Sequence, residues 1–253
     1  MNIKNLSDFL TVVIKTIHRP WCCARLIQSV DRHIPGVPIH VLDDGQPDRR
    51  LSATFKNEAN RVNKLIETAF DIGISAGRNQ LLSTVDTPFF LLLDDDHVIT
   101  SQSHVATLVS QLANYGRECD LLAAKSNDSG KPRCFRVDDE NRVLRAEARF
   151  HRRDGHVYFC DMVPNTFVAK TEVVRDIGWD ESLKLHEHWE FFYRAWMNGL
   201  RVAISHDHRF DHKHVYRTDY QKLRNRSWYL EKGLRKHGLR RFMWTSPMKE
   251  TES

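Results

Sequence analysis

The sequence predicts an α/β protein with a mostly parallel sheet that helices flank on both faces, together with a smaller antiparallel portion. Three observations support this fold class. Short β-branched runs alternate with segments of helical periodicity over the first half of the chain. The apolar run Phe89–Leu93 is typical of a buried strand. After about Ser126 this alternation gives way to segments with the character of hairpin strands.

The bulk composition is that of a globular protein. The chain of 253 residues suits one large domain, and a hydrophobic content of 41% is enough for a sizeable core. No apolar run reaches transmembrane length, and the first residues read as a strand and not as a signal peptide. Five scattered or adjacent cysteines without C-x-x-C spacing argue against a zinc knuckle or a disulfide framework. We expect a cytoplasmic location, with a peripheral position at the inner face of a membrane as the alternative.

The positive charge is concentrated late in the chain. The net charge is +5, and much of the excess lies in the segment YQKLRNRSWYLEKGLRKHGLRRFMW. Such a surplus favours polyanionic partners: nucleic acid, anionic lipid or phosphorylated glycans. A solvated helix that only keeps the protein soluble is an equally good interpretation.

The elements of the first half follow in order. Leu10–Thr16 is a β-branched run and predicts a buried strand. Residues 19–36 have helical spacing and a Pro-Gly stop. Residues 37–44 predict a second strand that ends in an acidic turn. Residues 49–65 are a helix or a helical loop. A weak strand, a glycine-containing loop and a helix with Ser75 as its N-cap come next. This half then ends with the strand 89–96, the helix 103–116 and the strand 119–126.

The second half is expected to begin with hairpin strands, over residues 130–150 and 155–170. We then expect two helices, at residues 170–178 and 187–199, and a strand over residues 201–207. A histidine-rich loop and a basic helix complete the chain. We expect a single domain over residues 1–253. Its parts are a first half at 1–126, a second half at 127–216 and a basic C-terminal helical tail at 217–253.

Three adjacent carboxylates follow the fourth predicted strand. Ligands of parallel α/β sheets bind beyond the carboxyl ends of the strands, so Asp94–Asp96 and the acidic turn Asp43–Asp44 should face one crevice. Because side chains alternate along a strand, Asp94 and Asp96 are expected on one side and Asp95 on the other. Paired carboxylates there fit a hard divalent cation, Mg²⁺ or Mn²⁺. Solvated carboxylates in a turn are the alternative.

A cation at such a strand end commonly holds a pyrophosphate, because it neutralises charge that builds on a leaving group. If the leaving group is a nucleoside diphosphate, the transferred group is a sugar. The sequence thus points to transfer from a sugar nucleotide.

The chain resembles the Rossmann-like GT-A glycosyltransferases, especially the inverting family 2 enzymes and the related β-1,4-N-acetylgalactosaminyltransferases. The stretches TVVIKTIHRP, HVLDDGQPD, GISAGRNQLL and LLLDDDHVIT resemble, in this order, the opening strand and nucleotide loop, the acidic uridine turn, the GxxxARN segment and the DXD motif. Gly77 stands where that segment has Ala. Residues 163–204 are similar to the acceptor-side segment, and the likeness extends to about Tyr216.

The resemblance implies a nucleotide-binding first half and an acceptor-side second half. It places Asp44 near the uracil and ribose, with Asp43 in the same turn. The residues it implies for binding of the nucleotide-sugar are Thr16, Arg19, Asp43, Asp44, Arg78, Asn79, Asp94 and Asp95. It implies Asp96 as a metal ligand, with Asp94 and a late histidine. His212 is the best match for that histidine and His214 the second, among a cluster that also holds His206 and His208.

The catalytic base is less clearly indicated. An inverting transferase needs a group that takes the proton of the acceptor hydroxyl. Family 2 enzymes usually place an Asp in an "ED" pair at a helix start, whereas here the segment reads HEHWEFF. Glu190 and Glu187 are nearly equal candidates because residues three apart share a helix face. His188, which stands in place of the Asp, is the third candidate.

The resemblance implies a metal-dependent inverting glycosyltransferase. It would move a sugar from a UDP-sugar, such as UDP-GalNAc, UDP-Gal or UDP-GlcNAc, to a hydroxyl on a glycan, lipid-linked or other polyanionic acceptor. A nucleotidyltransferase is an alternative, weakened because KTIHRPW lacks the glycine of a phosphate loop. A basic nucleic-acid-binding protein is another, and the two ideas combine in a glycosyltransferase that acts on modified DNA.

Overall fold

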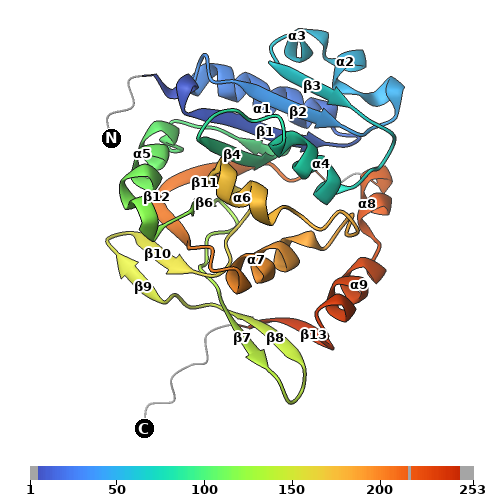
Figure 1. Cartoon of the computed structure of the whole chain (residues 1–253). Helices are drawn as coiled ribbons and strands as arrows, with labels where there is room; N and C mark the ends of the chain where they lie inside the picture. Colours follow the sequence, from blue (N-terminus) through green and yellow to red (C-terminus); the bar gives the residue numbers. More distant parts are fainter. Residues whose placement is uncertain (1–4, 216–217, 246–253) are drawn as a thin grey trace.

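The computed structural model describes residues 5–215 and 218–245. A ten-stranded sheet crosses the molecule, with nine strands in the order β3-β2-β1-β4-β11-β6-β12-β10-β9 and β5 paired to β12 (Figure 1). The strands are β1 (Leu10–Thr16), β2 (Ile39–Asp43), β3 (Lys64–Glu67), β4 (Phe89–Asp94), β5 (His97–Val98), β6 (Leu121–Ser126), β9 (Arg152–Asp154), β10 (Val157–Cys160), β11 (Thr166–Lys170) and β12 (Val202–His212).

The first four strands form the parallel part that the sequence predicts. β3, β2, β1 and β4 are parallel neighbours, and the crossovers between them carry helices. β11 then enters antiparallel between β4 and β6, so the second half of the chain completes the sheet of the first. The α-helices of the described residues are α1 (Pro20–His33), α2 (Leu51–Thr54), α3 (Lys56–Ala59), α4 (Ile74–Leu82), α5 (Val105–Tyr115), α6 (Thr171–Ile177), α7 (Glu187–Met197), α8 (Thr218–Arg224) and α9 (Trp228–Lys236).

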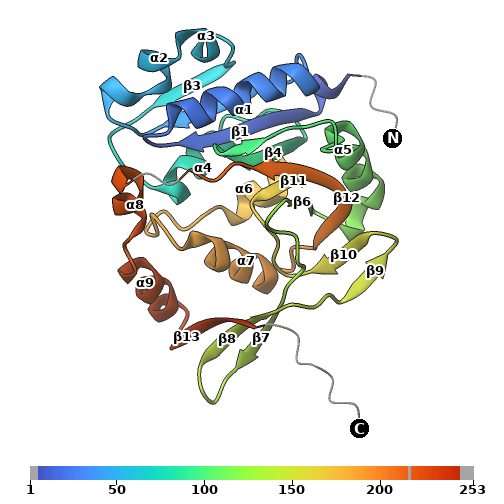
Figure 2. The same cartoon turned by 180° about the vertical axis from the view of Figure 1, so that it is seen from behind.

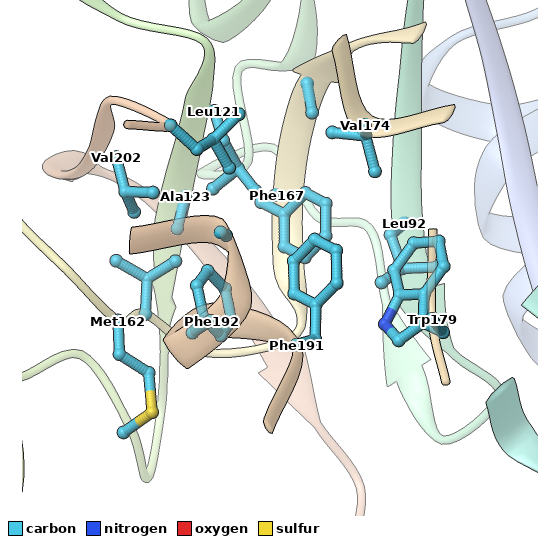
Figure 3. Close-up of a cluster of buried hydrophobic side chains, with 14 of the residues drawn as sticks. Leu92, Leu121, Ala123, Met162, Phe167, Val174, Trp179, Phe191, Phe192 and Val202 are labelled. Carbon is cyan, nitrogen blue, oxygen red and sulfur yellow. The ribbon is translucent and has the colours of Figure 1, made fainter. Parts of the chain in front are cut away.

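Alternation along the central strands gives each face of the sheet its own core. In β4, Leu91 and Leu93 pack with side chains of α1 and α5, whereas Phe90 and Leu92 pack with those of α4, α6 and α7. Figure 3 shows the second core, where Phe191 and Phe192 of α7 lie against Phe167 of β11. α7 is thereby fixed to the sheet.

A separate three-stranded sheet lies beside the main sheet, below it in Figures 1 and 2. β7 (Cys134–Asp138) and β8 (Val143–Glu147) form the predicted antiparallel hairpin. β13 (Arg241–Thr245) pairs parallel to β8. Within the described residues, the expected helical tail at 217–253 contains the helices α8 and α9, but its residues 241–245 form the strand β13 instead. Residues 216–217 and 246–253 lie outside the described part.

Four smaller expectations also fail. The residue that precedes α4 is Gly73, and the hydroxyl of Ser75 donates instead to the Leu183 carbonyl at 2.6 Å. Residues 155–170 do not form one hairpin, since β10 pairs with β9 and β12 while β11 pairs with β4 and β6.

The histidine-rich segment is not a loop but the end of the long strand β12. Because residues four apart share a helix face, the sequence also predicts that Trp196 packs inward with Phe192, but Trp196 is 37% exposed whereas Phe192 is fully buried. In the described residues, no helix is both long and apolar enough to cross a membrane.

Candidate active site

The carboxyl ends of three parallel strands meet at one edge of the sheet. Lys15 of β1 lies in register with Asp94 of β4, and Thr16 lies in register with Asp43 of β2. The two acidic clusters thus reach the same edge, as the strand order predicts. The functional side chains come from this edge, from α4 and α7 on one face, and from the end of β12.

Protein cations already lie among the three adjacent carboxylates. Arg78 donates to Asp94 at 2.9 Å, and Arg19 donates to Asp96 at 2.6 Å and also to Asp95. Asp95 and Asp96 therefore share one guanidinium. The expected alternation is wrong beyond Asp94, because β4 ends there and the next two residues form a turn.

The environment separates the pKa values of the three acids. Burial raises the pKa of Asp95 to about 6, against the opposing effect of Arg19 and of the Thr16 hydroxyl at 2.6 Å. Burial also opposes ionisation of Asp96, but the His212 hydrogen bond and Arg19 outweigh it and hold the pKa of Asp96 well below its usual range. Similarly, the pKa of Asp94 is lowered because Arg78 outweighs burial.

Asp96 and His212 offer a cation a carboxylate and an imidazole. The Nε2 atom of His212 lies 3.3 Å from Oδ1 of Asp96, while its Nδ1 atom lies 2.9 Å from Asp128. The His97 ring stacks on His212 with a centroid distance of 4.6 Å. An imidazole oriented by a second carboxylate is a common arrangement around protein-bound metals. This oxygen–nitrogen donor set fits Mn²⁺, and a predominantly oxygen-ligated Mg²⁺ less well.

α7 presents only part of its acidic face to this site. Glu187 opens the helix, is 5% exposed and accepts from Arg78 at 2.9 Å. His188 is hydrogen-bonded to the Val163 carbonyl at 2.8 Å, and burial lowers its pKa. Glu190 turns away, toward Arg194 and α9, and is fully buried. Of the two glutamates, only Glu187 lines the pocket described next.

One cavity of about 570 Å³ joins these groups. Eight of the site residues that the sequence predicts line this cavity: Arg19, Arg78, Asp94, Asp95, Asp96, Glu187, His188 and His212. Sequence reasoning missed Lys15, Lys184, Tyr220 and Arg224, which also line it. Lys15 carried a usable signal, because a charged residue in the opening strand faces the acidic end of β4. Tyr220 and Arg224 carried none that set them apart from the rest of the basic segment.

Four other predicted binding residues do not line this cavity. Asp43 accepts from the backbone N–H groups of Gly45 and Leu51, and so shapes the turn after β2. Asp44 is fully buried beside Lys15 at 2.6 Å. Thr16 holds Asp95. Asn79 bonds to both backbone groups of Trp179, which ties α4 to the segment after α6.

The remaining histidines of the cluster lie apart from the cavity. His206 bonds to the Gly130 carbonyl, and His208 contacts Gln111. His214 lies beside Asp128, whose pKa is lowered to about 2 as its hydrogen bonds to Ser126, His214 and His212 outweigh burial. The structure thus brings His212, and not these three, to Asp96.

Comparison with known proteins identifies the family and agrees with the fold. Residues 11–174 match the model of glycosyl transferase family 2. Human beta-1,4 N-acetylgalactosaminyltransferase 1 is 30% identical over 220 residues, 82% of this chain and 39% of the relative. Mouse beta-1,4 N-acetylgalactosaminyltransferase 2 is 26% identical over 198 residues, 75% of this chain and 36% of the relative. The chain thus spans about two fifths of the length of these curated relatives.

Two solved structures share the fold. A crystal structure of GalNAc-T7 with UDP, GalNAc and Mn²⁺ superposes with a TM-score of 0.63 at 17% identity, over 83% of this chain and 44% of that one. Residues 1–349 of TarS from S. aureus, in complex with UDP, give 0.57 at 18% identity, over 85% of this chain and 63% of that one. The fold is that of a GT-A glycosyltransferase. The chain belongs to glycosyl transferase family 2.

Proposed function

We propose that the chain transfers a sugar from a UDP-sugar to a hydroxyl group of a glycan, with inversion at the anomeric carbon and with a divalent cation. The observation that carries this proposal is one cavity that holds both a cation-binding pair, Asp96 and His212, and a carboxylate base candidate, Glu187. A transferase of this class needs these two groups close to the same bond.

Asp96 and His212 are proposed to hold the cation, preferably Mn²⁺. When bound, such a cation neutralises the charge that develops on a departing diphosphate. Arg19 already neutralises Asp95 and Asp96, and therefore keeps the cluster stable before a cation arrives. Of the five Lys and Arg side chains that line the cavity, only Arg224 has no carboxylate at ion-pair distance among the described residues, although Asp94 lies near enough to interact with it electrostatically. Arg224 bonds to the Tyr220 hydroxyl at 2.9 Å, so it remains available for a diphosphate.

Glu187 is proposed as the group that takes the proton of the acceptor hydroxyl. It lies at the N-terminus of α7 in the cavity wall, and Arg78 fixes its orientation. Glu190 is a weaker candidate, because Arg194, Lys236 and His237 already surround it away from the cavity. His188 is weaker also, since one of its ring nitrogens is engaged by the Val163 carbonyl.

The relatives suggest the sugar and the stereochemistry. Their names describe beta-1,4 transfer of N-acetylgalactosamine. UDP-GalNAc carries its sugar in α linkage, so a β product requires inversion. We therefore propose an N-acetylhexosamine donor, with UDP-GalNAc before UDP-GlcNAc, and UDP-Gal as the hexose alternative.

The basic C-terminal segment is less free for a polyanion than its composition suggests. Arg226 pairs with Asp71, Lys236 pairs with Asp180 and Glu190, and Arg235 pairs with Glu231. Arg226 and Lys236 thus hold the segment against the rest of the protein, whereas the Arg235 pair lies within α9. Family membership likewise favours glycosyl transfer over nucleotidyl transfer or nucleic-acid binding.

Turnover of a donor panel tests this proposal. Purified protein with Mn²⁺ is incubated with UDP-GalNAc, UDP-GlcNAc, UDP-Gal and UDP-glucose, without and with a mixture of glycan acceptors, and released UDP is measured. We expect UDP release from at least one donor, its loss in EDTA, and its loss in Asp96→Asn. Absence of UDP release from every donor in the folded wild-type protein would contradict the proposal.

A further inference from the structure

The cavity has a second wall of a different chemical character. Beyond the charged groups, aromatic and aliphatic side chains line it: Leu185, Trp189, Leu223, Leu230, Phe242 and Trp244. Phe242 and Trp244 belong to β13 of the small sheet, while Trp189 belongs to α7. None of these side chains has a place in the donor site described above.

Two of the aromatic rings stack on each other, and the third stands edge-on to one of them. Phe242 stacks on Trp189, with a centroid distance of 5.2 Å and an interplanar angle of 21°. Trp244 stands edge-on to Phe242 at 5.2 Å. Trp189 is buried, whereas Trp244 is 54% exposed. Arg133 lies 4.8 Å from the Trp244 ring centroid and holds that ring in place.

This wall adjoins the candidate base. Trp189 and Glu187 both belong to the first turn of α7, and both line the same cavity. An acceptor must bring its hydroxyl to the base before it can attack. The surface beside Glu187 is therefore where the acceptor would rest.

The mixture of groups on this wall fits a saccharide better than an acyl chain. The C–H bonds on one side of a pyranose ring make a flat, weakly positive face that matches the negative face of an indole ring. Asn165 and His186 also line the cavity and offer hydrogen-bonding groups for sugar hydroxyls. An acyl chain would leave these polar groups unpaired.

We propose that Trp244, supported by Phe242 and Trp189, is the platform on which a sugar ring of the acceptor stacks while its hydroxyl faces Glu187. This inference rests on the proposed glycosyl transfer and specifies the acceptor side of the same site. It also gives the small sheet a role, because β13 carries the exposed ring into the cavity wall.

Trp228 provides a matched control. It is exposed to a similar extent, 52%, but it lies at the start of α9 and is not among the residues that line the cavity. The experiment compares wild type, Trp244→Ala, Trp244→Phe and Trp228→Ala. Fluorescently labelled protein with UDP and Mn²⁺ is applied to a printed array of defined glycans, and donor hydrolysis without acceptor is measured in parallel.

Wild type and Trp228→Ala are expected to bind the same glycans, and Trp244→Ala to bind them about tenfold more weakly. Trp244→Phe should recover part of this loss, and all four proteins should hydrolyse the donor equally. Equal glycan binding by Trp244→Ala and wild type overturns the platform, and so does binding of no glycan by wild type. Absence of donor hydrolysis by the wild-type protein would instead contradict the proposed function. Failure of the platform and failure of the proposed function are therefore distinguishable.

Discussion

Arg78 bridges Asp94 and Glu187, with a donor–acceptor distance of 2.9 Å to each carboxylate. One guanidinium thus joins the end of β4 to the start of α7, although Arg78 and Glu187 are 109 residues apart in sequence. Its planar fork suits two carboxylates at once, which a lysine ammonium cannot match. In the proposed reaction, Asp94 belongs to the donor side of the site and Glu187 is the candidate base.

Replacing Arg78 by Met should therefore impair stability and turnover together. It leaves Glu187 buried without its cation, and loss of one partner of a buried pair costs about 3–5 kcal/mol. Because Asp94 is partly exposed and can regain water, we expect the lower end, about 3 kcal/mol, in urea-induced unfolding. Arg78→Lys should recover stability only in part. Unchanged stability in Arg78→Met would contradict the structural importance of the bridge.

Substitution of the two glutamates separates the candidate bases. Glu187→Gln should lower kcat for transfer by about 10²–10⁴-fold, since a neutral amide cannot take a proton, while UDP affinity stays near that of wild type. Glu190→Gln should mainly reduce stability, by about 1–3 kcal/mol, because it removes the charge that Arg194, Lys236 and His237 surround. The reverse pattern of kcat values, measured on folded protein, would transfer the role of base to Glu190.

Arg224→Ala should weaken UDP binding by about tenfold or more, because a charged hydrogen bond contributes about 1.5–3 kcal/mol. The reason is that Arg224 is the cavity cation without a carboxylate at ion-pair distance among the described residues. Isothermal titration with UDP measures the effect, and uridine serves as the control ligand. Equal weakening of uridine binding would mean that Arg224 contacts the nucleoside and not the diphosphate.

Asp120 should make stability depend on pH in the acidic range. Burial opposes its ionisation, but hydrogen bonds from Arg201 and Lys170 outweigh burial and lower its pKa. A lowered folded-state pKa contributes stability above the unfolded value of about 3.9, and this contribution is lost as pH falls through the folded value. Asp120→Asn should thus lower the unfolding free energy by about 1–2 kcal/mol at pH 7, with partial exposure of Arg201 limiting the effect.

The pH series of this variant provides its own control. The difference in unfolding free energy between wild type and Asp120→Asn should stay constant from pH 7 to pH 5 and shrink below about pH 4. A difference that persists unchanged at pH 3 would mean that the carboxylate charge does not supply it.

The parallel half of the fold was predictable because its strands are short apolar runs that end in acidic or glycine-containing turns. The run Phe89–Leu93 became β4, and the register of β1 with β2 and β4 brought the strand ends to one edge of the sheet. The expectation that both acidic clusters face one crevice was only partly met, because Asp43 and Asp44 do not line the cavity. The order of the later strands was not predictable. Nothing in the sequence of β11 indicates that it inserts antiparallel between β4 and β6, since that pairing depends on contacts distant in sequence.

The site was partly predictable for a similar reason. Asp94–Asp96, Arg78 and His212 belong to recognisable motifs, and each reaches the cavity, whereas Asp43 and Asp44 do not. The different surroundings of Glu187 and Glu190 could not be predicted from the sequence, because their spacing places both on one side of a helix. Only the tertiary structure shows that Glu187 lines the cavity while Glu190 lies against the end of α9. Trp244 was hidden in a segment of helical appearance that in fact ends in β13.

The measurement that tests the account most directly is the affinity of UDP for wild type and Asp96→Asn, each titrated with Mn²⁺ and with EDTA. If Asp96 and His212 hold a cation that contacts the diphosphate, Mn²⁺ will raise the UDP affinity of wild type at least tenfold and leave that of Asp96→Asn nearly unchanged. Equal UDP affinities in all four titrations, with both proteins folded, would contradict the central claim that a cation at Asp96 binds the donor.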